Sequence, residues 1–278
     1  MSRFDLTIGE FASRTGVSDA TLRIWERRYG FPEPLRTARG HRRYAVEQAQ
    51  AVARVLAMRE SGLSIRAAIA RAQAPVDPDT FSLFCTLRDL RADLQPRAVR
   101  KPVLVALSHA IEDEALARAQ ALVAFGCFQR ERFYRSSQAR WRELASAAHA
   151  AAVFADFHSL GAPASGPLEV PIARHQQIWR EWAIILHGGS ASICMVAREL
   201  ASSNVEVASR DRTFELLWSV DPGAVSALAR VCVEVLRTRL PEAAARAEHE
   251  LMQGSSATPA ELLRLTTAVV DRMLPELA

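Results

Sequence analysis

Arginines gather in two short stretches near the amino terminus, where their spacing suits recognition of phosphate. Three lie within residues 23–28 and four within residues 34–44. A guanidinium group matches the oxygens of a phosphate with two parallel hydrogen bonds. Residues 1–73 hold 13 arginines and 7 acidic residues, a net charge of +6, whereas residues 74–278 carry −2. The first 73 residues are therefore expected to bind a polyanion; the alternative is that these arginines form a solvated surface.

Two short helices must position the first of these stretches. A capping pattern at Thr7 predicts a helix over Ile8–Arg14, and Ser18 predicts the start of a second helix over Asp19–Arg28. Gly16 supplies the left-handed residue of the turn between them. Helices joined in this way form a helix-turn-helix, whose second helix enters a DNA major groove about 12 Å wide. The residues of that helix expected to face DNA are Thr21, Arg23, Arg27 and Arg28, whereas Ala20, Leu22 and Trp25 can pack inward.

A basic connector and two further helices complete this part of the chain. Residues Pro34–Tyr44 lack helical periodicity and place four arginines around Gly40, as a loop suited to phosphate contact. Helices are predicted over Val46–Glu60 and Ile65–Gln73. Residues 74–79 are predicted to be a linker, because two prolines there forbid a continuing helix.

The first quarter of the chain resembles the DNA-binding domain of the MerR family. The residues that carry the resemblance are LTIGEFASRTGVSDATLRIWERRYGFPEPLRTARGHRRY. The resemblance implies a homodimer on a pseudo-palindromic promoter element, RNA polymerase as a partner there, and activation by untwisting an over-long promoter spacer. Carried onto this chain, it implies DNA contacts by Ser18, Thr21, Arg23, Trp25, Arg28, Arg36, Arg39, His41, Arg42, Arg43 and Tyr44. This chain has Ile24 and Trp25 where many family members have tyrosine.

The rest of the chain alternates between helical and strand periodicity. The predicted helices are Phe81–Leu94, Pro102–Ala119, Gln138–Ala148, Pro222–Leu240 and Pro259–Leu277. The predicted strands are Leu122–Phe128, Ala151–Phe157, Trp182–Leu186, Ser192–Ala197 and Phe214–Val220, with a loop over Gly161–Pro171. We therefore expect an all-α winged helix-turn-helix head and an α/β sensory domain, a mixed sheet with flanking helices, followed by a C-terminal helix. The expected boundaries are 1–73 for the head, 74–94 for a linker and candidate dimerisation helix, 95–240 for the α/β domain and 241–278 for a helical tail.

Residues from about Leu94 to Leu240 resemble the DICT domain, which is named for its occurrence with diguanylate cyclases and two-component proteins. The segments that carry the resemblance are LVALSHAIEDE, FGCFQRERFYR, RWRELA, VFADF and WSVDP. The resemblance implies a sensory role for this region. It supplies neither a ligand nor a catalytic set.

Two groups of side chains in this region are candidates for binding an effector. His109, Glu112 and Asp113 share one helix face, where they could hold a metal ion, pair with Arg130 and Arg132, or form an ordinary acidic face. An aromatic group comprises Phe125, Phe128, Phe133, Tyr134 and Trp141. Such a group suits a planar or anionic ligand, and core packing is the alternative. The candidate effector-binding residues are His109, Glu112, Phe128, Gln129, Arg130, Phe133, Tyr134 and Trp182, with no metal or cofactor assigned.

Residues Asp156–Gly161 spell D-x-H-x-x-G directly after a predicted strand. The pattern resembles a cobalamin-binding loop, in which His158 would ligate cobalt. A cobalamin site needs a helix directly after that loop, and the Gly/Pro-rich residues 161–167 cannot form one, so the sequence favours a chance match. No Ser/His/Asp grouping, glycine-rich phosphate loop or paired-cysteine motif is present, which argues against an enzyme.

The amino terminus lacks a signal-peptide core, no apolar run approaches membrane-spanning length, and the four cysteines are scattered, so a reduced cytoplasmic protein is expected. Candidate dimerisation helices are Phe81–Leu94 and Pro259–Leu277, with intramolecular packing the alternative for each. The sequence thus predicts a one-component transcriptional regulator that binds double-stranded promoter DNA as a dimer and responds to a small-molecule effector or a partner protein. A ligand-independent architectural DNA binder and a photoreceptor that binds cobalamin or another cofactor stay open.

Overall fold

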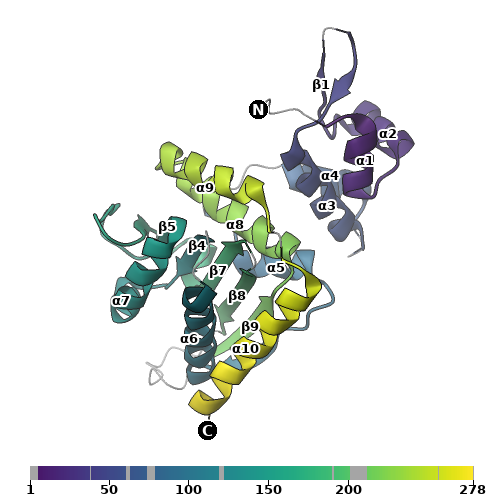
Figure 1. Ribbon diagram of the computed structural model, residues 1–278. Coiled ribbons are helices and arrows are strands. Elements are labelled where there is room, and N and C mark those ends of the chain that lie inside the picture. The colour runs from purple at the N-terminus through teal and green to yellow at the C-terminus, as the bar shows by residue number, and fades with distance from the viewer. Residues whose placement is uncertain are drawn as a thin grey trace. The chain divides into compact units, whose positions relative to one another are not determined.

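The chain divides into two compact units, each with its own hydrophobic core (Figure 1). The computed structural model describes residues 6–37, 39–60, 63–73, 79–118, 122–189, 191–200, 212–255 and 257–277. The first unit is built from Met1–Pro75 with Asp89–Ala92, and the second from Val76–Arg88 with Asp93–Ala278. Most of the predicted linker, residues 74–78, lies outside the described residues.

The first unit contains helices and a short two-stranded wing. In chain order, its elements among the described residues are α1 (Ile8–Thr15), α2 (Asp19–Tyr29), β1 (Leu35–Arg36), β2 (Arg42–Arg43), α3 (Val46–Glu60) and α4 (Ile65–Gln73). The predicted capping box is present, because the Glu10 N–H donates to Thr7 Oγ1 at 3.3 Å and the Thr7 N–H donates to Glu10 Oε2 at 2.7 Å. Gly16, with φ of 70°, ends α1 in the left-handed conformation that the sequence predicted.

The basic connector forms the wing. Leu35 pairs with Arg43 and Arg36 pairs with Arg42 in antiparallel register. Gly40 has φ of 78°, and its N–H donates to the carbonyl of Thr37 at 2.8 Å. This tight turn places Arg36 on one strand and Arg42 and Arg43 on the adjacent strand, with Arg39 in the turn between them.

Helix α2 turns two large side chains into the core of the first unit. Leu22 and Trp25 are both buried there, as expected for positions three residues apart. The expectation that Ala20 packs inward was wrong, because Ala20 lies two residues from Leu22, on the opposite side of the helix, and is exposed.

The second unit is a seven-stranded mixed sheet between two layers of helices, and the expected fold class is confirmed. Its strands are β3 (Arg97–Arg100), β4 (Leu122–Cys127), β5 (Ala148–Ala155), β6 (Leu168–Pro171), β7 (Glu181–Gly188), β8 (Ala191–Glu199) and β9 (Thr213–Ser219). They lie in the order β3-β9-β8-β7-β4-β5-β6. The β4–β5 and β5–β6 pairs are parallel, and the remaining pairs are antiparallel.

Helices cover both faces of this sheet, as Figure 1 shows. One face packs against α5 (Leu83–Leu90), α8 (Pro222–Arg237) and α9 (Pro241–Gln253). The other face packs against α6 (Lys101–Arg118), α7 (Glu131–Ala147) and α10 (Pro259–Leu277). Central strands are therefore apolar on both sides, and on β4 Phe125 enters one core while Ala124 enters the other. Within the described ranges, no helix combines the length and the hydropathy that a membrane crossing needs.

The sequence predicted no bounds for the two wing strands, for β3 and β6, or for a 3-10 helix at Gln177–Arg180. Helix α9 lies inside the expected helical tail of residues 241–278, without having been predicted as a separate helix. The expectation of a loop over residues 161–171 was wrong at its end, because Leu168–Pro171 pairs with β5. Both β3 and β6 are edge strands of four residues. In so short a segment, the alternation of apolar and polar residues that identifies a strand is hard to detect. An edge position also tolerates Pro171, whose missing N–H leaves no unmet donor inside the sheet.

Both candidate dimerisation helices bury their apolar stripe inside the second unit. On α5, Leu83, Phe84 and Leu87 are at most 1% exposed and belong to the sheet core. On α10, Leu265 and Val269 are buried against the opposite face of the sheet. Helix α5 is also shorter than predicted, ending at Leu90. Packing within the chain, the alternative to dimerisation, therefore accounts for the apolar stripe of each helix.

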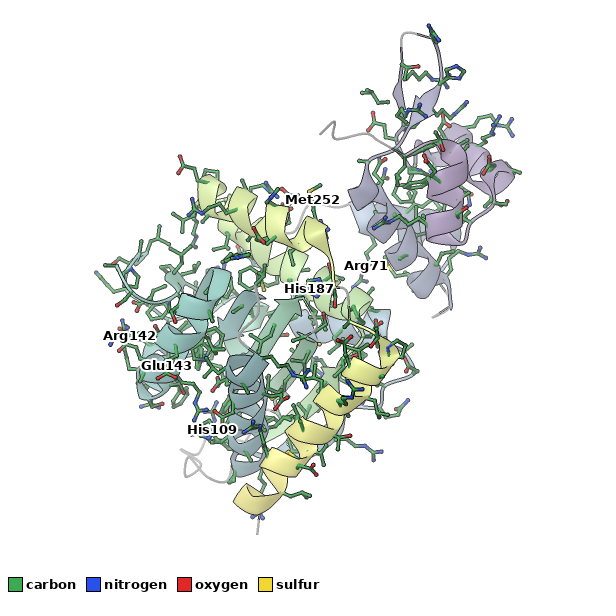
Figure 2. The ribbon with its side chains drawn as sticks, in the orientation of Figure 1. Arg71, His109, Arg142, Glu143, His187 and Met252 are labelled. Atoms are coloured by element: carbon green, nitrogen blue, oxygen red, sulfur yellow. The ribbon has the colours of Figure 1, made fainter. Side chains whose placement is uncertain are left out.

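A histidine is buried in the hairpin between β7 and β8 (Figure 2). His187 is 2% exposed, and its Nδ1 lies 2.8 Å from Ser192 Oγ on the neighbouring strand. Burial, reinforced by the positive charge of Arg230, lowers the pKa of His187 to about 4. The imidazole is therefore neutral at neutral pH, and it acts as a fixed polar link within the sheet.

Candidate functional site

Cationic side chains stand exposed on α2 and on the wing. Arg23, Arg27 and Arg28 project from α2, and Arg39 from the turn of the wing. Arg43 on β2 is half-buried. None of these five arginines makes an ion pair with another described residue. Their charge is thus available to an external anion, as the sequence predicted for most of them.

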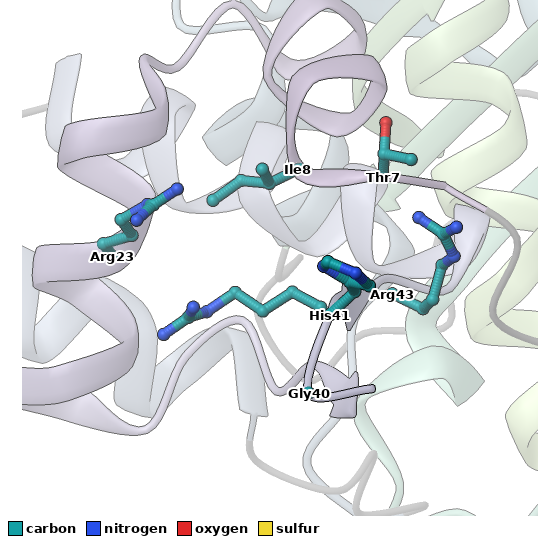
Figure 3. Close-up of a pocket in the computed structure, with 7 residues that line it drawn as sticks. Thr7, Ile8, Arg23, Gly40, His41 and Arg43 are labelled. Atoms are coloured by element: carbon teal, nitrogen blue, oxygen red, sulfur yellow. The ribbon is translucent and has the colours of Figure 1, made fainter. Parts of the chain in front are cut away.

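A hollow of about 400 Å³ lies between α2, the wing and the start of α1. The residues that line it are Thr7, Ile8, Arg23, Gly40, His41, Arg42 and Arg43. Figure 3 shows Arg23 on one side of the hollow and Arg43 on the other. No carboxylate belongs to this lining, so the hollow concentrates positive potential where two elements meet. Its chemistry suits a phosphate oxygen.

Glu26 on α2 braces the wing, a role that the sequence analysis missed. Its Oε2 lies 2.7 Å from Arg42 Nε, and its Oε1 lies 3.2 Å from Arg36 Nη2. The hydrogen bond to Glu26 raises the pKa of Arg42. Arg42 is only 25% exposed and is held in place by this bond, whereas Arg36 keeps 57% of its side chain exposed. The sequence contains one signal for this bracing role, because the acidic residue Glu26 lies among the three arginines of residues 23–28.

Two of the expected DNA contacts lie in the core instead. Trp25 is 6% exposed and stacks on Phe31, with ring centroids 6.4 Å apart. Tyr44 is fully buried and stacks on Phe11 at 4.5 Å, and its hydroxyl is buried with no hydrogen-bond partner among the described residues. Of the two expectations for Trp25, inward packing is the one that the structure shows, and the expectation that Tyr44 reaches DNA was wrong. Their apolar rings fill the space between α1, α2 and the wing, which a small head needs for a core.

Ser18 and Thr21 lie at the amino end of α2. Ser18 Oγ accepts from the Thr21 N–H at 3.2 Å and caps the helix, and the two hydroxyls are 2.9 Å apart. Ser18 is exposed and Thr21 is half-buried. Both stand where the positive end of the helix favours an anion.

Most of the candidate effector residues of the second unit are packed in its core. Phe128 is 6% exposed, Tyr134 is fully buried, and their rings meet edge to face at 5.5 Å. Trp141, also fully buried, meets Phe128 at 5.4 Å. Trp182 packs edge-on against Phe214 at 6.1 Å. The alternative of core packing therefore holds for Phe128, Tyr134 and Trp141, because their rings already pack against one another.

The acidic face of α6 is paired internally. Glu112 is 2% exposed, and its Oε1 accepts from Trp141 Nε1 at 2.8 Å. Asp113 forms an ion pair with Arg140, rather than with Arg130 or Arg132. Burial raises the pKa of Glu112 to about 7. Within the part of the chain that the structure describes, no group of three His, Cys, Asp or Glu side chains converges on a metal position, and the pairing of Glu112 and Asp113 supports the alternative of an ordinary acidic face.

The remaining candidates lie where β4 ends. Gln129 is 3% exposed with φ of 61°, and its Oε1 accepts from Arg212 Nη2 at 2.7 Å. Arg130 lies over the ring of Trp179, 5.2 Å from its centroid. Phe133 is half-buried on the first turn of α7. This end of the sheet is thus polar and partly open, unlike the aromatic core beside it.

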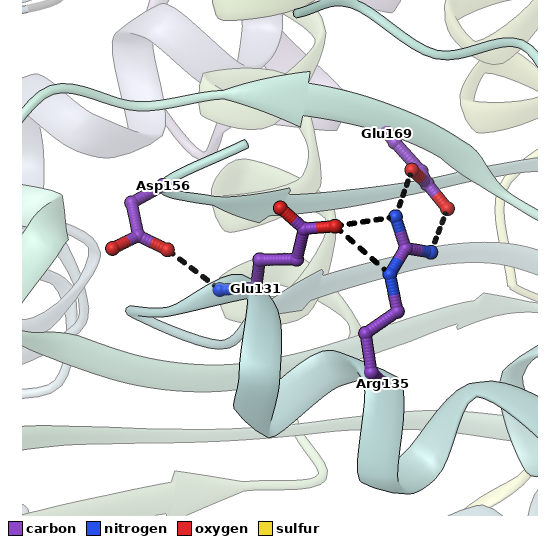
Figure 4. Close-up of polar contacts among 4 residues, drawn as sticks. All are labelled: Glu131, Arg135, Asp156 and Glu169. Atoms are coloured by element: carbon purple, nitrogen blue, oxygen red, sulfur yellow. Dashed lines mark hydrogen bonds and ion pairs between the residues drawn. The ribbon is translucent and has the colours of Figure 1, made fainter. Parts of the chain in front are cut away.

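The carboxylate of the D-x-H-x-x-G segment is used to hold a helix (Figure 4). Asp156 Oδ1 accepts from the backbone N–H of Glu131, the first residue of α7, at 2.6 Å. Arg135, one turn further on, bridges Glu131 and Glu169, at 2.7 Å and 2.8 Å from its Nη2. Asp156 therefore supplies the cap that Arg130, at the N-cap position, does not give.

Replacing Asp156 by alanine is expected to lower the free energy of unfolding of the second unit by about 0.5–2 kcal/mol, as for loss of a helix cap. The matched control is His158→Ala, because His158 is exposed and its replacement is expected to change stability by less than about 0.5 kcal/mol. Urea denaturation followed by circular dichroism measures both. Equal losses for the two variants would contradict the capping role of Asp156.

Parts of both units are similar to known protein families. Residues 6–74 match the family described as "MerR HTH family regulatory protein". Residues 82–200 match the family described as "Sensory domain in DIguanylate Cyclases and Two-component system". The chain is also similar to "HTH-type transcriptional repressor CarA" of Myxococcus xanthus, at 50% identity over 68 residues. That similarity covers 24% of this chain and 24% of the repressor, so it spans about a quarter of each.

Proposed function

We propose that the chain is a DNA-binding transcription regulator that binds a promoter element of two half-sites as a homodimer, since residues 6–74 match the MerR HTH family and residues 82–200 match the DICT sensory domain. A signal received by the second unit changes the occupancy of that element. The observation that carries the proposal is the exposure of Arg23, Arg27 and Arg28 on α2 and of Arg39 on the wing, none of which forms an ion pair with a carboxylate among the described residues.

In this proposal α2 enters the major groove and the wing follows the phosphates beside it. The proposed contacts are Ser18, Thr21, Arg23, Arg27, Arg28, Arg36, Arg39, His41 and Arg43, with Arg42 holding the wing on α2 through Glu26. Exposed arginines on two elements match the two parts of such a contact: base edges for the helix and phosphates for the wing. RNA polymerase at the same promoter is the partner through which occupancy affects transcription.

Dimerisation follows from the small size of the head. A single helix-turn-helix with one wing contacts only a few base pairs, and a second head raises the affinity through its effective concentration. The candidate dimerisation helices α5 and α10 use their apolar stripes inside the second unit, so the proposal assigns the dimer contact to neither stripe.

Neutralising the wing with Arg39→Gln and Arg43→Gln together is expected to weaken binding to every duplex at least about tenfold, which corresponds to about 1.4 kcal/mol. The slope of log affinity against log salt is expected to fall by about 2 for each head, because two phosphate contacts are lost. Fluorescence anisotropy over a salt series measures both, with the chain's own upstream region against a scrambled duplex.

The control is Arg66→Gln, which removes an exposed arginine of α4 outside α2 and the wing and is expected to change neither quantity. Native mass spectrometry of the same complex is expected to show two chains on each element. An unchanged salt slope in the wing variant would contradict the wing assignment. One chain on each element would contradict the dimer, and equal affinity for the upstream and scrambled duplexes would overturn the proposed regulator.

A further inference from the structure

Two apolar side chains stand exposed on α2, the helix that the proposed function places in the major groove. Ile24 is 44% exposed, and Ala20, one turn earlier, is also exposed. Leu22 and Trp25 of the same helix are buried in the core of the first unit. Ala20 and Ile24 therefore form a short apolar strip on the outer side of α2, which we call the Ala20–Ile24 strip.

The strip lies between the exposed arginines of α2. An α-helix turns by about 100° per residue, so Arg23 and Arg28 lie about 140° apart around the helix. Arg27, Ala20 and Ile24 lie between them, at about 40°, 60° and 100° from Arg23. Arg23 also borders the hollow beside the wing (Figure 3). The strip thus has a cation on each side, and no acidic residue of α2 falls within this part of the helix surface.

An apolar strip between cations matches the cross-section of a DNA major groove. The groove is about 12 Å wide, with charged phosphates along its rims and base edges on its floor. A helix with its side chains is about 10–12 Å across, so a helix in the groove brings its flanking side chains to the rims and its outermost side chains to the floor. The apolar group that a base presents on that floor is the C5-methyl group of thymine.

The position of the strip along α2 also suits contact with bases. Residues near the amino end of a recognition helix are the ones that reach base edges. Ala20 is the second residue of α2, and Ile24 is the sixth. The short side chain of Ala20 allows the helix to approach the bases closely. Four residues of helix rise by about 6 Å, close to two base-pair steps of about 3.4 Å, so the strip spans about two steps of a duplex.

We propose that the Ala20–Ile24 strip recognises thymine through its methyl group, and that Ile24 is a residue that determines the sequence specificity of this chain. Contact between Ile24 and the methyl group removes apolar surface of both from water. Cytosine and adenine present amino groups in the major groove, and those groups would lose water there without gaining an acceptor from an apolar side chain. The inference rests on the proposed function and deepens it, because it names the base that α2 recognises.

The test compares two forms of the chain's own upstream region, one with thymine and one with uracil at every thymine position. The two bases differ only in the C5-methyl group. In fluorescence anisotropy, the full chain is expected to bind the uracil duplex at least about fourfold more weakly, the effect of one buried methyl group. Ile24→Ala is expected to weaken binding of the thymine duplex by a similar factor, and binding of the uracil duplex by less than about twofold, because the methyl partner is already absent.

Two further variants of α2 serve as controls. Ile24→Val keeps a branched apolar side chain and is expected to keep the preference for thymine within about twofold. Arg27→Gln removes a cation beside the strip and is expected to weaken binding of both duplexes by the same factor, because their phosphates are identical. Ile24 is exposed, so its replacement is expected to leave the fold intact, and the thermal midpoint of each variant checks this.

Three results would overturn the inference: equal binding of the thymine and uracil duplexes by the wild type, unchanged affinity of Ile24→Ala for the thymine duplex, or an equal loss on both duplexes in that variant. If the chain still prefers its upstream region to a scrambled duplex, each of these results leaves the proposed regulator intact. Equal binding of the upstream and scrambled duplexes would overturn the proposed regulator and this inference together.

Discussion

Replacing Trp141 by alanine is expected to lower the free energy of unfolding of the second unit by about 3–5 kcal/mol. The indole is fully buried and packs edge-on against Phe128 at 5.4 Å. Its Nε1 also donates to Glu112, so truncation leaves a cavity and removes a hydrogen bond from a buried carboxyl group whose other partner is Arg140, at 3.3 Å. Urea denaturation followed by far-ultraviolet circular dichroism measures the loss.

Two further variants separate the cavity from the hydrogen bond. Trp141→Phe keeps most of the aromatic volume and is expected to cost about 1–3 kcal/mol, the penalty of an unsatisfied buried acceptor. Adding Glu112→Gln in the Trp141→Phe background is expected to recover part of that loss, because a neutral amide is cheaper to bury than a carboxylate. A cost below about 1 kcal/mol for Trp141→Ala would contradict the assignment of this indole to a tightly packed core.

Gly126 shows how closely Trp141 fits. A Cβ added at Gly126 would lie 2.5 Å from Cη2 and 2.6 Å from Cζ2 of the indole, closer than any contact that side chains tolerate. The glycine of β4 is thus required by the tryptophan of α7, fifteen residues later in the chain. This pairing explains why an aromatic group that resembles a ligand pocket in the sequence is filled in the structure.

Replacing Glu181 by alanine is expected to lower the free energy of unfolding by about 3 kcal/mol, since two buried N–H groups lose their acceptor at about 1–3 kcal/mol each. Glu181 on β7 is 1% exposed and accepts from the N–H groups of Leu83 at 2.8 Å and Phe84 at 3.3 Å. Its carboxylate also accepts from the hydroxyl of Ser82. It therefore fastens the amino end of α5 to the sheet.

Glu181 also makes the stability of the second unit depend on pH. Burial raises the pKa of Glu181 from 4.5 to about 7. Between these values the folded chain holds a proton that the unfolded chain releases, so stability falls as pH rises, by up to about 1.4 kcal/mol per pH unit. Glu112 acts in the same direction, because its pKa is raised for the same reason. His187, with a pKa lowered to about 4, acts in the opposite direction below its ordinary value of 6.5.

The variant Glu181→Gln cannot titrate at this position. Its free energy of unfolding is therefore expected to fall less steeply with rising pH than that of the wild type, by up to about 1.4 kcal/mol per pH unit. Urea denaturation at half-unit steps from about pH 5 to about pH 7.5 measures the slope in both chains, the range being set by the raised pKa. Ser136→Ala on α7 is the control, because that exposed hydroxyl bonds only within its own helix. An identical slope for Glu181→Gln and the wild type would contradict the raised pKa.

Local signals in the sequence determined much of this protein. Thr7 and Ser18 begin α1 and α2 as predicted, and Gly16 ends α1, because a cap or a left-handed turn is decided within four residues of chain. The five predicted strands of the sheet carry apolar residues on both faces, so their composition alone identified them. The exposed arginines of α2 followed from the same helical periodicity.

Only the tertiary structure decided which residue meets which. Whether Tyr44 faces outward or inward depends on α1 packing against it, and the sequence around Tyr44 does not contain that information. The partner of Glu112 is an indole from α7, and the cations around Phe133 come from residues 101, 132 and 212. Such contacts join segments separated by tens of residues, and their energy depends on burial and distance, which exist only after the sheet has brought those segments together.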